Sequence, residues 1–180
     1  YITCLDSLFT MPRARLVAFC HALVRRKLGI KWICYARADD LCDDEVVLLM
    51  REAGCIQVQV GIESGDQGQL DRMQKRTTVR ENARALDACR RAGLTTVVSL
   101  IVGFPGETRA TLQRTCDMLA ASPPDFHFLA TFSTRVATVP ILQPEHAERH
   151  DLVTDANPRT VSPYWRHATM SCADVGNHVR

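Results

Sequence analysis

Polar and glycine-rich segments that could bind a charged ligand follow four apolar runs of the sequence. They are Asp6-Ser7, Arg37-Ala38-Asp39, Gly61-Ile62-Glu63-Ser64-Gly65 and Gly103-Phe104-Pro105-Gly106-Glu107-Thr108. The carboxylate of Glu63 lies between glycines that permit close approach to the backbone, and it could accept hydrogen bonds from a ribose diol. The turn at Gly103 leads into a helix N-terminus, which could bind an anion or pack against an adenine ring. A solvated acidic turn and a purely structural turn are the alternatives at these two places.

Other side chains give weaker signals of chemistry. Lys75 and Arg76 precede a helix, and they form either a solvated basic pair or a partner for a carboxylate. His146 and His150 have the spacing of one helix face, but Ala147 stands where the glutamate of a zinc-binding HExxH motif would be. The glycine turns are not followed by Gly-Lys-Ser/Thr, so they are not nucleotide-binding P-loops. The serines lie outside any nucleophile-elbow context, which disfavours a hydrolase.

The elements that must position these groups are marked by a repeated junction. A helical pattern meets a glycine, and a β-branched run follows at once. The three junctions are Gly29 before residues 30–35, Gly54 before residues 55–60 and Gly93 before residues 94–102. A left-handed glycine commonly ends a helix, and the runs have the length and composition of strands. The first residues of the chain and residues 126–132 read as two further strands.

Helices are predicted between the strands from apolar residues at helical spacing. They lie around residues 16–23, 46–53, 78–91 and 112–119. Asp43 is a suitable N-cap for the second helix, and Thr78 to Glu81 form a capping box for the third. From Pro140 onward, prolines and polar residues predict an irregular extension with a short helix near residues 171–178.

Alternating strands and helices imply parallel strands joined by right-handed crossovers. Part of a (β/α) barrel and an open doubly wound sheet both satisfy this order. In both folds the carboxyl ends of the strands lie on one rim, so Asp6, Arg37, Glu63 and Gly103 are expected to converge there. Ser99 would reach the same cleft only if it points inward, because side chains alternate along a strand.

Composition and charge exclude several classes of protein. Of the 180 residues, 46% are hydrophobic and 23% charged, and the formal net charge of +2 predicts no strong attraction to nucleic acid or membrane surfaces. The apolar runs are too short to span a bilayer. There is no signal peptide, and the sequence opens with Tyr1 in a strand-like run, so we expect it to start inside a larger protein.

The eight cysteines are scattered, with no CxxC pair and no tight metal-binding cluster. Most lie in apolar strand or helix contexts. Buried free thiols in a reducing cytoplasm are therefore the expected state, and a cytoplasmic location follows from it.

Six short motifs occur in a fixed order over residues 1–132. They are residues 6–10 (DSLFT), 32–39 (WICYARAD), 54–55 (GC), 61–66 (GIESGD), 73–78 (MQKRTT) and 101–108 (IVGFPGET). Together they resemble the radical S-adenosylmethionine superfamily, especially its cobalamin-dependent and methylthiotransferase-like branches. The resemblance implies an α/β fold in which residues 1–135 form a partial (β/α) barrel of the TIM type with parallel strands. Residues 136–180 would be an irregular C-terminal extension or linker.

The resemblance also implies roles for individual residues in binding S-adenosylmethionine. Asp6 and Ser7 match the position that binds the methionine amino group, and Glu63 matches the ribose-binding position. Lys75 or Arg76 matches the basic residue that pairs with the methionine carboxylate. Ser99 matches a second ribose ligand found in some relatives. The adenine platform is matched by Ile101, Val102 and Phe104. Arg37 would point from its strand toward the same end of the barrel. The implied cofactor-binding set is Asp6, Ser7, Arg37, Glu63, Lys75, Ser99, Ile101, Gly103 and Phe104, with Val102 beside it.

Two family features are missing from the sequence. The CxxxCxxC loop, whose three thiolates hold a 4Fe–4S cluster, would precede the region where this sequence begins, so no residue here is expected to bind metal. The Pro-Gly-Thr element is replaced near residues 136–140 by Val-Ala-Thr-Val-Pro. We therefore expect the chain by itself to be inactive.

The leading hypothesis is a fragment of a radical enzyme. Its intact form would cleave S-adenosylmethionine at a 4Fe–4S cluster to a 5′-deoxyadenosyl radical, for methyl or methylthio transfer. Cobalamin and an upstream cobalamin-binding domain are possible companions. The alternatives are a degenerate, non-catalytic barrel that binds the cofactor or a partner, and an ordinary (β/α) enzyme with coincidental motifs.

Overall fold

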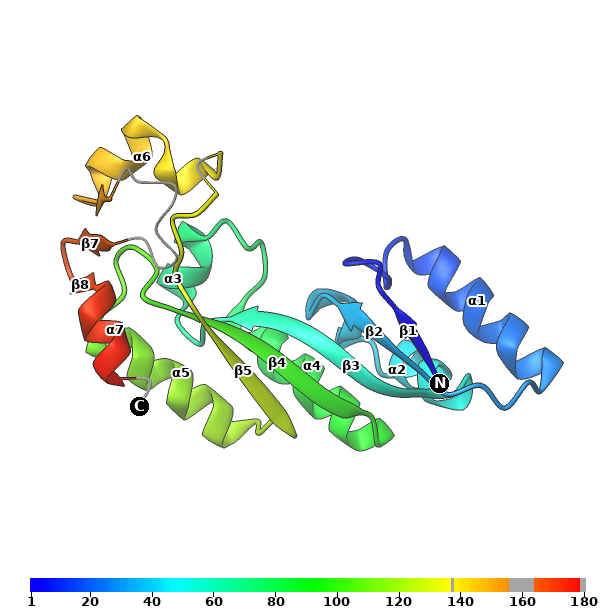
Figure 1. The fold of residues 1–180 in the computed structure, drawn as a ribbon. Helices are drawn as coiled ribbons and strands as arrows, with labels where there is room; N and C mark the ends of the chain where they lie inside the picture. The colour runs from blue at the N-terminus through cyan, green and yellow to red at the C-terminus, as the bar shows by residue number, and fades with distance from the viewer. Residues whose placement is uncertain (137, 156–163, 179–180) are drawn as a thin grey trace.

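A five-stranded parallel sheet forms the centre of the computed structural model, which describes residues 1–136, 138–155 and 164–178. The strands are adjacent in chain order, β1-β2-β3-β4-β5, and every neighbouring pair is parallel. Their bounds are β1 Ile2–Cys4, β2 Trp32–Ala36, β3 Cys55–Glu63, β4 Thr95–Val102 and β5 Phe126–Thr131. The predicted parallel α/β fold is therefore confirmed (Figure 1).

Helices follow the strands and cover one face of this sheet. They are α1 Arg13–Arg26, η1 Asp39–Cys42, α2 Asp44–Glu52, α3 Gln67–Arg72, α4 Val79–Ala92 and α5 Arg109–Ala121. Along β4 the residues alternate between buried and half-buried, and the main core joins the buried side of the strands to α1, α2, α4 and α5. A doubly wound sheet would carry helices on both faces. Strands in chain order with helices on one face instead make an open segment of a (β/α) barrel.

The helix boundaries follow local sequence signals. The Asp43 carboxylate accepts hydrogen bonds from the backbone N–H groups of Glu45 and Val46. Thr78 and Glu81 form the predicted capping box. Gly93 ends α4 in the left-handed conformation, as expected, whereas α1 ends three residues before Gly29 and uses Lys27 as its left-handed cap.

The C-terminal region is more ordered than the sequence analysis anticipated. Its elements are η2 Pro140–Leu142, α6 Pro144–Arg149, β6 Val153–Thr154, β7 Trp165–His167, β8 Met170–Ser171 and α7 Cys172–His178. The three strands form a small antiparallel sheet, and α7 is the short helix predicted near residues 171–178. Figure 1 shows this region beside the carboxyl ends of β4 and β5.

A second core joins this C-terminal region to the barrel segment. The ring of Phe132 meets those of Phe104 and Trp165 edge to face, with centroids 5.5 and 5.3 Å away. Val102 and Val175 belong to the same buried cluster. The turn after β4 is therefore a packing surface for the C-terminal region.

The outer strands of the large sheet are β1 and β5, and exposed apolar side chains lie on or directly after them. Leu5, Phe126 and Phe128 are all more than half exposed. In the described part of the chain, no helix is long and apolar enough to cross a membrane.

Candidate functional site

A charged pair at the carboxyl end of β3 is the centre of the candidate site. Lys75 Nζ lies 2.9 Å from Glu63 Oε1, and both side chains are mostly buried. The pair occupies the space beside Gly61. A Cβ atom built on that glycine would lie 2.5 Å from Glu63 Oε1 and 2.9 Å from Lys75 Nζ. The glycine therefore leaves the room that the pair needs.

An irregularity in the sheet orients Glu63. Gly61 pairs with Ser99 of β4, but Glu63 pairs with the very next residue, Leu100, so β3 carries one extra residue here. Such a bulge bends the strand and re-aims the side chain beside it. Glu63 also has a φ of 63°, a left-handed conformation that is uncommon for residues other than glycine. Strained backbone of this kind clusters at ligand-binding sites.

A tight loop between α3 and α4 presents Lys75. The Lys75 backbone N–H donates to the carbonyl oxygen of Leu70 at 3.0 Å. On either side, Gln74 and Arg76 are left-handed, with φ of 52° and 57°. Arg76 is exposed, so of the two basic residues considered from the sequence, the structure brings only Lys75 to the Glu63 carboxylate.

Ser99 lies on the same face of the sheet as this pair. It is the β4 residue opposite Gly61 and, on its other side, Phe128 of β5. Ser99 and Ile101 are both half-buried and share the face that the helices leave uncovered. The Ser99 hydroxyl makes no hydrogen bond within the described ranges, so it is available to a ligand.

The second glycine of the motif around Glu63 has a structural task. A Cβ on Gly65 would lie 2.6 Å from the α-carbon of Thr115 in α5, and the Gly65 N–H donates to the Thr115 hydroxyl at 2.9 Å. Asp66 forms an ion pair with Arg114 at 2.5 Å. Gly65 thus permits close approach of α5, and our interpretation that it admits a ligand is wrong for this residue.

The turn after β4 is bound to the C-terminal region. The Gly103 N–H donates to Glu107 Oε2 at 2.5 Å, and the Gly103 carbonyl oxygen is 3.2 Å from His167 Nε2. The Thr169 hydroxyl donates to the Glu107 carbonyl oxygen at 2.6 Å. A Cβ on Gly103, whose φ is 85°, would meet Trp165 at 2.5 Å.

The electrostatics of this turn follow from its burial. Burial raises the pKa of the Glu107 carboxyl to about 7, while the Gly103 N–H opposes the shift and Asp66 adds to it. Burial also lowers the pKa of His167. Sequence reasoning missed both residues as partners, because His167 lies 64 positions from Gly103 in an extension with no recognisable motif.

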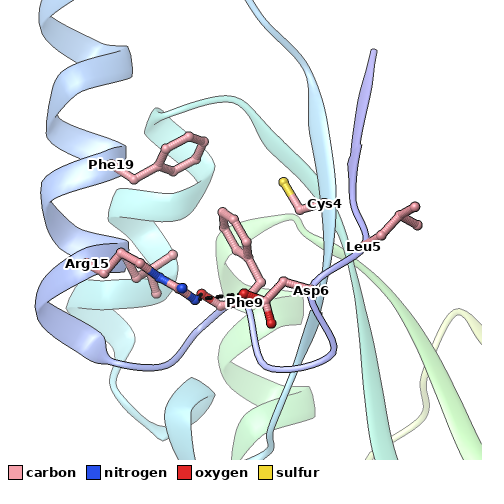
Figure 2. A pocket seen from close by; sticks show the side chains of 7 residues that line it. Cys4, Leu5, Asp6, Phe9, Arg15 and Phe19 are labelled. Carbon is pink, nitrogen blue, oxygen red and sulfur yellow. Dashed lines mark hydrogen bonds and ion pairs between the residues drawn. The ribbon is translucent and has the colours of Figure 1, made fainter.

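Asp6 lies at the carboxyl end of β1, in a separate pocket of about 300 Å³. Figure 2 shows its carboxylate directed toward Arg15, and the two groups are 3.2 Å apart. The rings of Phe9 and Phe19 form the apolar wall, with centroids 5.3 Å apart. Ser7 is exposed.

The other residues that were predicted to bind the cofactor lie in different parts of the structure. Arg37 is held by Asp39 through two hydrogen bonds of 2.9 and 3.0 Å, which raise the pKa of the guanidinium. Ile101 and Glu63 border a cavity of about 380 Å³, whereas Phe104 packs in the second core. The structure therefore brings Glu63, Lys75 and Ser99 together. Asp6 shares their rim, through parallel strands, but lines a different pocket.

Cysteines that are distant in sequence lie close together in the main core. Contact with Cys55, followed by burial and the nearness of Cys4 and Cys20, raises the pKa of the Cys34 thiol. Thiols with raised pKa values stay protonated at neutral pH. Within residues 1–136, 138–155 and 164–178, no three His, Cys, Asp or Glu side chains are placed to hold a metal ion.

A family comparison agrees with this arrangement. The model of the radical SAM superfamily matches residues 10–119. The chain belongs to the radical SAM superfamily. S-adenosylmethionine and a 4Fe–4S cluster are the cofactors that this membership implies. The cysteines described above do not fit such a cluster, so its ligands are not among the residues that the structure describes.

Curated relatives come from several branches of the superfamily. An anaerobic magnesium-protoporphyrin IX monomethyl ester cyclase of Rubrivivax gelatinosus is 38% identical over 117 residues, which are 64% of this chain and 21% of the relative. An uncharacterized methyltransferase of Pyrococcus horikoshii is 31% identical over 62% of this chain and 24% of its own length. A tRNA-2-methylthio-N(6)-dimethylallyladenosine synthase of Treponema pallidum is also 31% identical, over 64% of this chain and 27% of the relative. The chain thus spans about a quarter or less of these proteins.

Solved structures show the same fold. The radical S-adenosylmethionine methyltransferase TsrM from Kitasatospora setae, with cobalamin and a [4Fe-4S] cluster bound, superposes with a TM-score of 0.69 at 20% identity, over 86% of this chain and 33% of TsrM. The cobalamin-dependent radical enzyme OxsB gives a TM-score of 0.55 at 25% identity, over 61% of this chain and 17% of OxsB.

Proposed function

We propose that this chain supplies the S-adenosylmethionine-binding rim of a radical enzyme. The observation that carries the proposal is the group formed by Glu63, Lys75 and Ser99 on the uncovered face of the sheet, at the carboxyl ends of β3 and β4. It combines a carboxylate, an ammonium and a hydroxyl. S-adenosylmethionine needs that combination, because it presents a ribose diol and a zwitterionic methionine.

In this arrangement each side chain has a separate task. The Glu63 carboxylate would accept hydrogen bonds from the ribose hydroxyls, and the Ser99 hydroxyl would add a second contact. The Lys75 ammonium would exchange its present partner, Glu63, for the methionine carboxylate. The exchange replaces one carboxylate partner of the mostly buried ammonium by another, so the charge of Lys75 stays paired.

The chemistry of the bound cofactor is reductive cleavage to a 5′-deoxyadenosyl radical, which requires an iron–sulfur cluster. The described residues do not fit that cluster. We propose methyl or methylthio transfer as the reaction of the whole enzyme, supported by the names of the methyltransferase and methylthio-forming relatives. Use of cobalamin, with a cobalamin-binding domain upstream, is supported by the cobalamin-bound structures.

Binding of S-adenosylmethionine to the 180-residue chain tests the proposal. Saturation-transfer NMR detects weak ligands, and weak binding is expected without a cluster to chelate the methionine. We expect Glu63→Gln and Lys75→Gln each to lower the affinity about tenfold, since a charge-assisted hydrogen bond contributes about 1.5–3 kcal/mol. Asp44→Asn removes an exposed ion pair with Arg91 and serves as the control. Equal binding by all variants would overturn the proposal.

The second candidate is a degenerate barrel that binds the cofactor without catalysis. The reading frame upstream of residue 1 separates the two. A CxxxCxxC segment within about 60 residues upstream would support the radical enzyme, since three thiolates complete the cluster. An upstream frame without it would support the degenerate barrel.

A further inference from the structure

A cavity of about 220 Å³ lies between the end of α3, the turn after β4 and residues 139–146. Five of its lining residues are apolar, with Met73, Phe104 and Ile141 among them, and the other three are Arg72, Gln74 and His146. It is distinct from the Glu63–Lys75 pair, whose residues do not line it. A binding pocket for a small molecule typically has such apolar walls and a few polar groups that fix orientation.

The Arg72 side chain, which is exposed overall, lies along the turn after β4. Its guanidinium and the last carbon of its stem lie over Gly106, where a Cβ atom would be 2.9 Å from Arg72 Nε. Gly106 is left-handed, with a φ of 86°. The neighbouring acid, Asp66, is engaged by Arg114. Across the described ranges, no carboxylate forms an ion pair with Arg72.

The positive charge in this region is concentrated. The pKa of His150 is lowered first by burial and then by the charges of Arg72, Arg149 and His146. These four groups therefore lie near one another. Arg149 has an exposed partner, Glu145, at 3.5 Å. Neither Arg72 nor His146 has such a partner among the residues that the structure places. The cavity therefore has an apolar floor, and no carboxylate among the described residues forms an ion pair with the guanidinium at its margin.

We propose that this cavity binds a small molecule with an apolar, ring-sized body and one oxyanion, either a carboxylate or a phosphate. The body would lie against Phe104, Met73 and Ile141, and the oxyanion would accept hydrogen bonds from the Arg72 guanidinium and the His146 ring. Guanidinium groups bind carboxylates and phosphates through paired donors. The volume is below that of most drug-sized pockets, which limits the body to about one ring. The proposal does not depend on cofactor binding at Glu63.

Three probes of one shape test the charge requirement. Benzoate and phenyl phosphate carry the oxyanion, and benzamide is the neutral counterpart of benzoate. The ¹⁵N-labelled 180-residue chain is titrated with each probe, and amide shifts are followed at Arg72 and residues 139–146. We expect at least one anion to saturate these shifts, and benzamide to bind at least tenfold more weakly. Preference for benzoate or for phenyl phosphate identifies which oxyanion the site takes.

Two variants test anion binding at this cavity in different ways. Arg72→Gln removes the cation and should lower the affinity for the preferred anion about tenfold. Val139→Asp places a carboxylate in the lining, where it should compete for Arg72 and reduce binding equally, even if Arg72→Gln fails to fold. Arg80→Gln, at an exposed arginine of α4, is the matched control. Equal binding of benzamide and benzoate, or equal losses in Val139→Asp and Arg80→Gln, would overturn the proposal.

Discussion

The ammonium of Lys75 lies 2.9 Å from the carboxylate of Glu63, in the space that a side chain at residue 61 would fill. Two segments meet at this point: the bulged end of β3, which carries Gly61 and Glu63, and the loop between α3 and α4, which carries Lys75. The pair therefore depends on the absence of a single methyl group, and that dependence can be measured.

Replacing Gly61 by alanine should weaken cofactor binding while preserving the fold. The new Cβ would meet only the flexible ends of Glu63 and Lys75, so the pair can move away without disturbing the backbone. We expect a change of less than about 1 kcal/mol in the free energy of unfolding and a loss of about tenfold in S-adenosylmethionine affinity by NMR titration. Gly176→Ala, where no atom lies within 4 Å of the new Cβ, is the control. A Gly61→Ala variant that binds like Gly176→Ala would contradict this prediction.

Replacing Gly103 by alanine should instead destabilise the protein. The Cβ would lie 2.5 Å from the Trp165 ring and 2.7 Å from Val175, and the φ of 85° strains any L-residue. We expect a loss of about 2 kcal/mol or more in urea unfolding. Hydrogen exchange of the β7 amides should accelerate more than that of β3, because the C-terminal sheet must move. Unchanged protection of β7 would show that Trp165 does not pack on this glycine.

The stability of the protein should depend on pH through Glu107. Its folded-state pKa, about 7, lies above the unfolded value because of burial. A carboxyl raised in this way contributes stability that is fully present below its unfolded pKa of about 4.3 and is lost as pH rises through the folded value. Relative to wild type, Glu107→Gln should therefore gain up to about 3 kcal/mol between pH 4 and pH 8. The difference between the two unfolding curves isolates this residue from His167, and a pH-independent difference would refute the assignment.

Thiol labelling should distinguish three classes of cysteine. Cys116 is exposed and should react at once with a thiol reagent, whereas four cysteines are buried and three half-buried. Burial raises the pKa of Cys20 and of Cys89 to about 12, so these thiols are protonated and unreactive at neutral pH. Mass spectrometry of the native chain should show one fast label, with Cys20, Cys34, Cys55 and Cys89 labelled only after unfolding. Fast labelling of Cys34 would contradict the buried arrangement.

The sheet could be predicted from sequence because its signals are local. A run such as Thr95–Val102 carries its β-branched composition in consecutive residues, and the Thr78 capping box marks a helix start within four positions. The strand ends could also be placed, so the convergence of Glu63 with Ser99 follows from parallel pairing alone. The bulge that orients Glu63 could not be foreseen, because it depends on how β3 and β4 register.

The features that could not be predicted from sequence depend on packing between residues that are distant in the chain. Trp165 and His167 carry no signal that assigns them to the turn at Gly103, and the strands of two or three residues around them are too short for a recognisable period. The thiols that meet at Cys34 were predicted to be buried, but not to be neighbours, because adjacency across strands is invisible in sequence spacing. Gly65 illustrates the same limit, since its partner is the backbone of α5.

The two open edges of the large sheet, β1 and β5, affect how the protein behaves in solution. β1 and β5 each present unpaired backbone N–H and C=O groups beside exposed apolar side chains such as Leu5 and Phe126. Either edge strand can pair with a strand from another polypeptide, and such pairing leads to edge-to-edge aggregation. In isolation the chain should sediment as larger species when its concentration rises. A lysine substitution at Phe126, which pairs with Val97 and not with Ser99, should reduce association through β5.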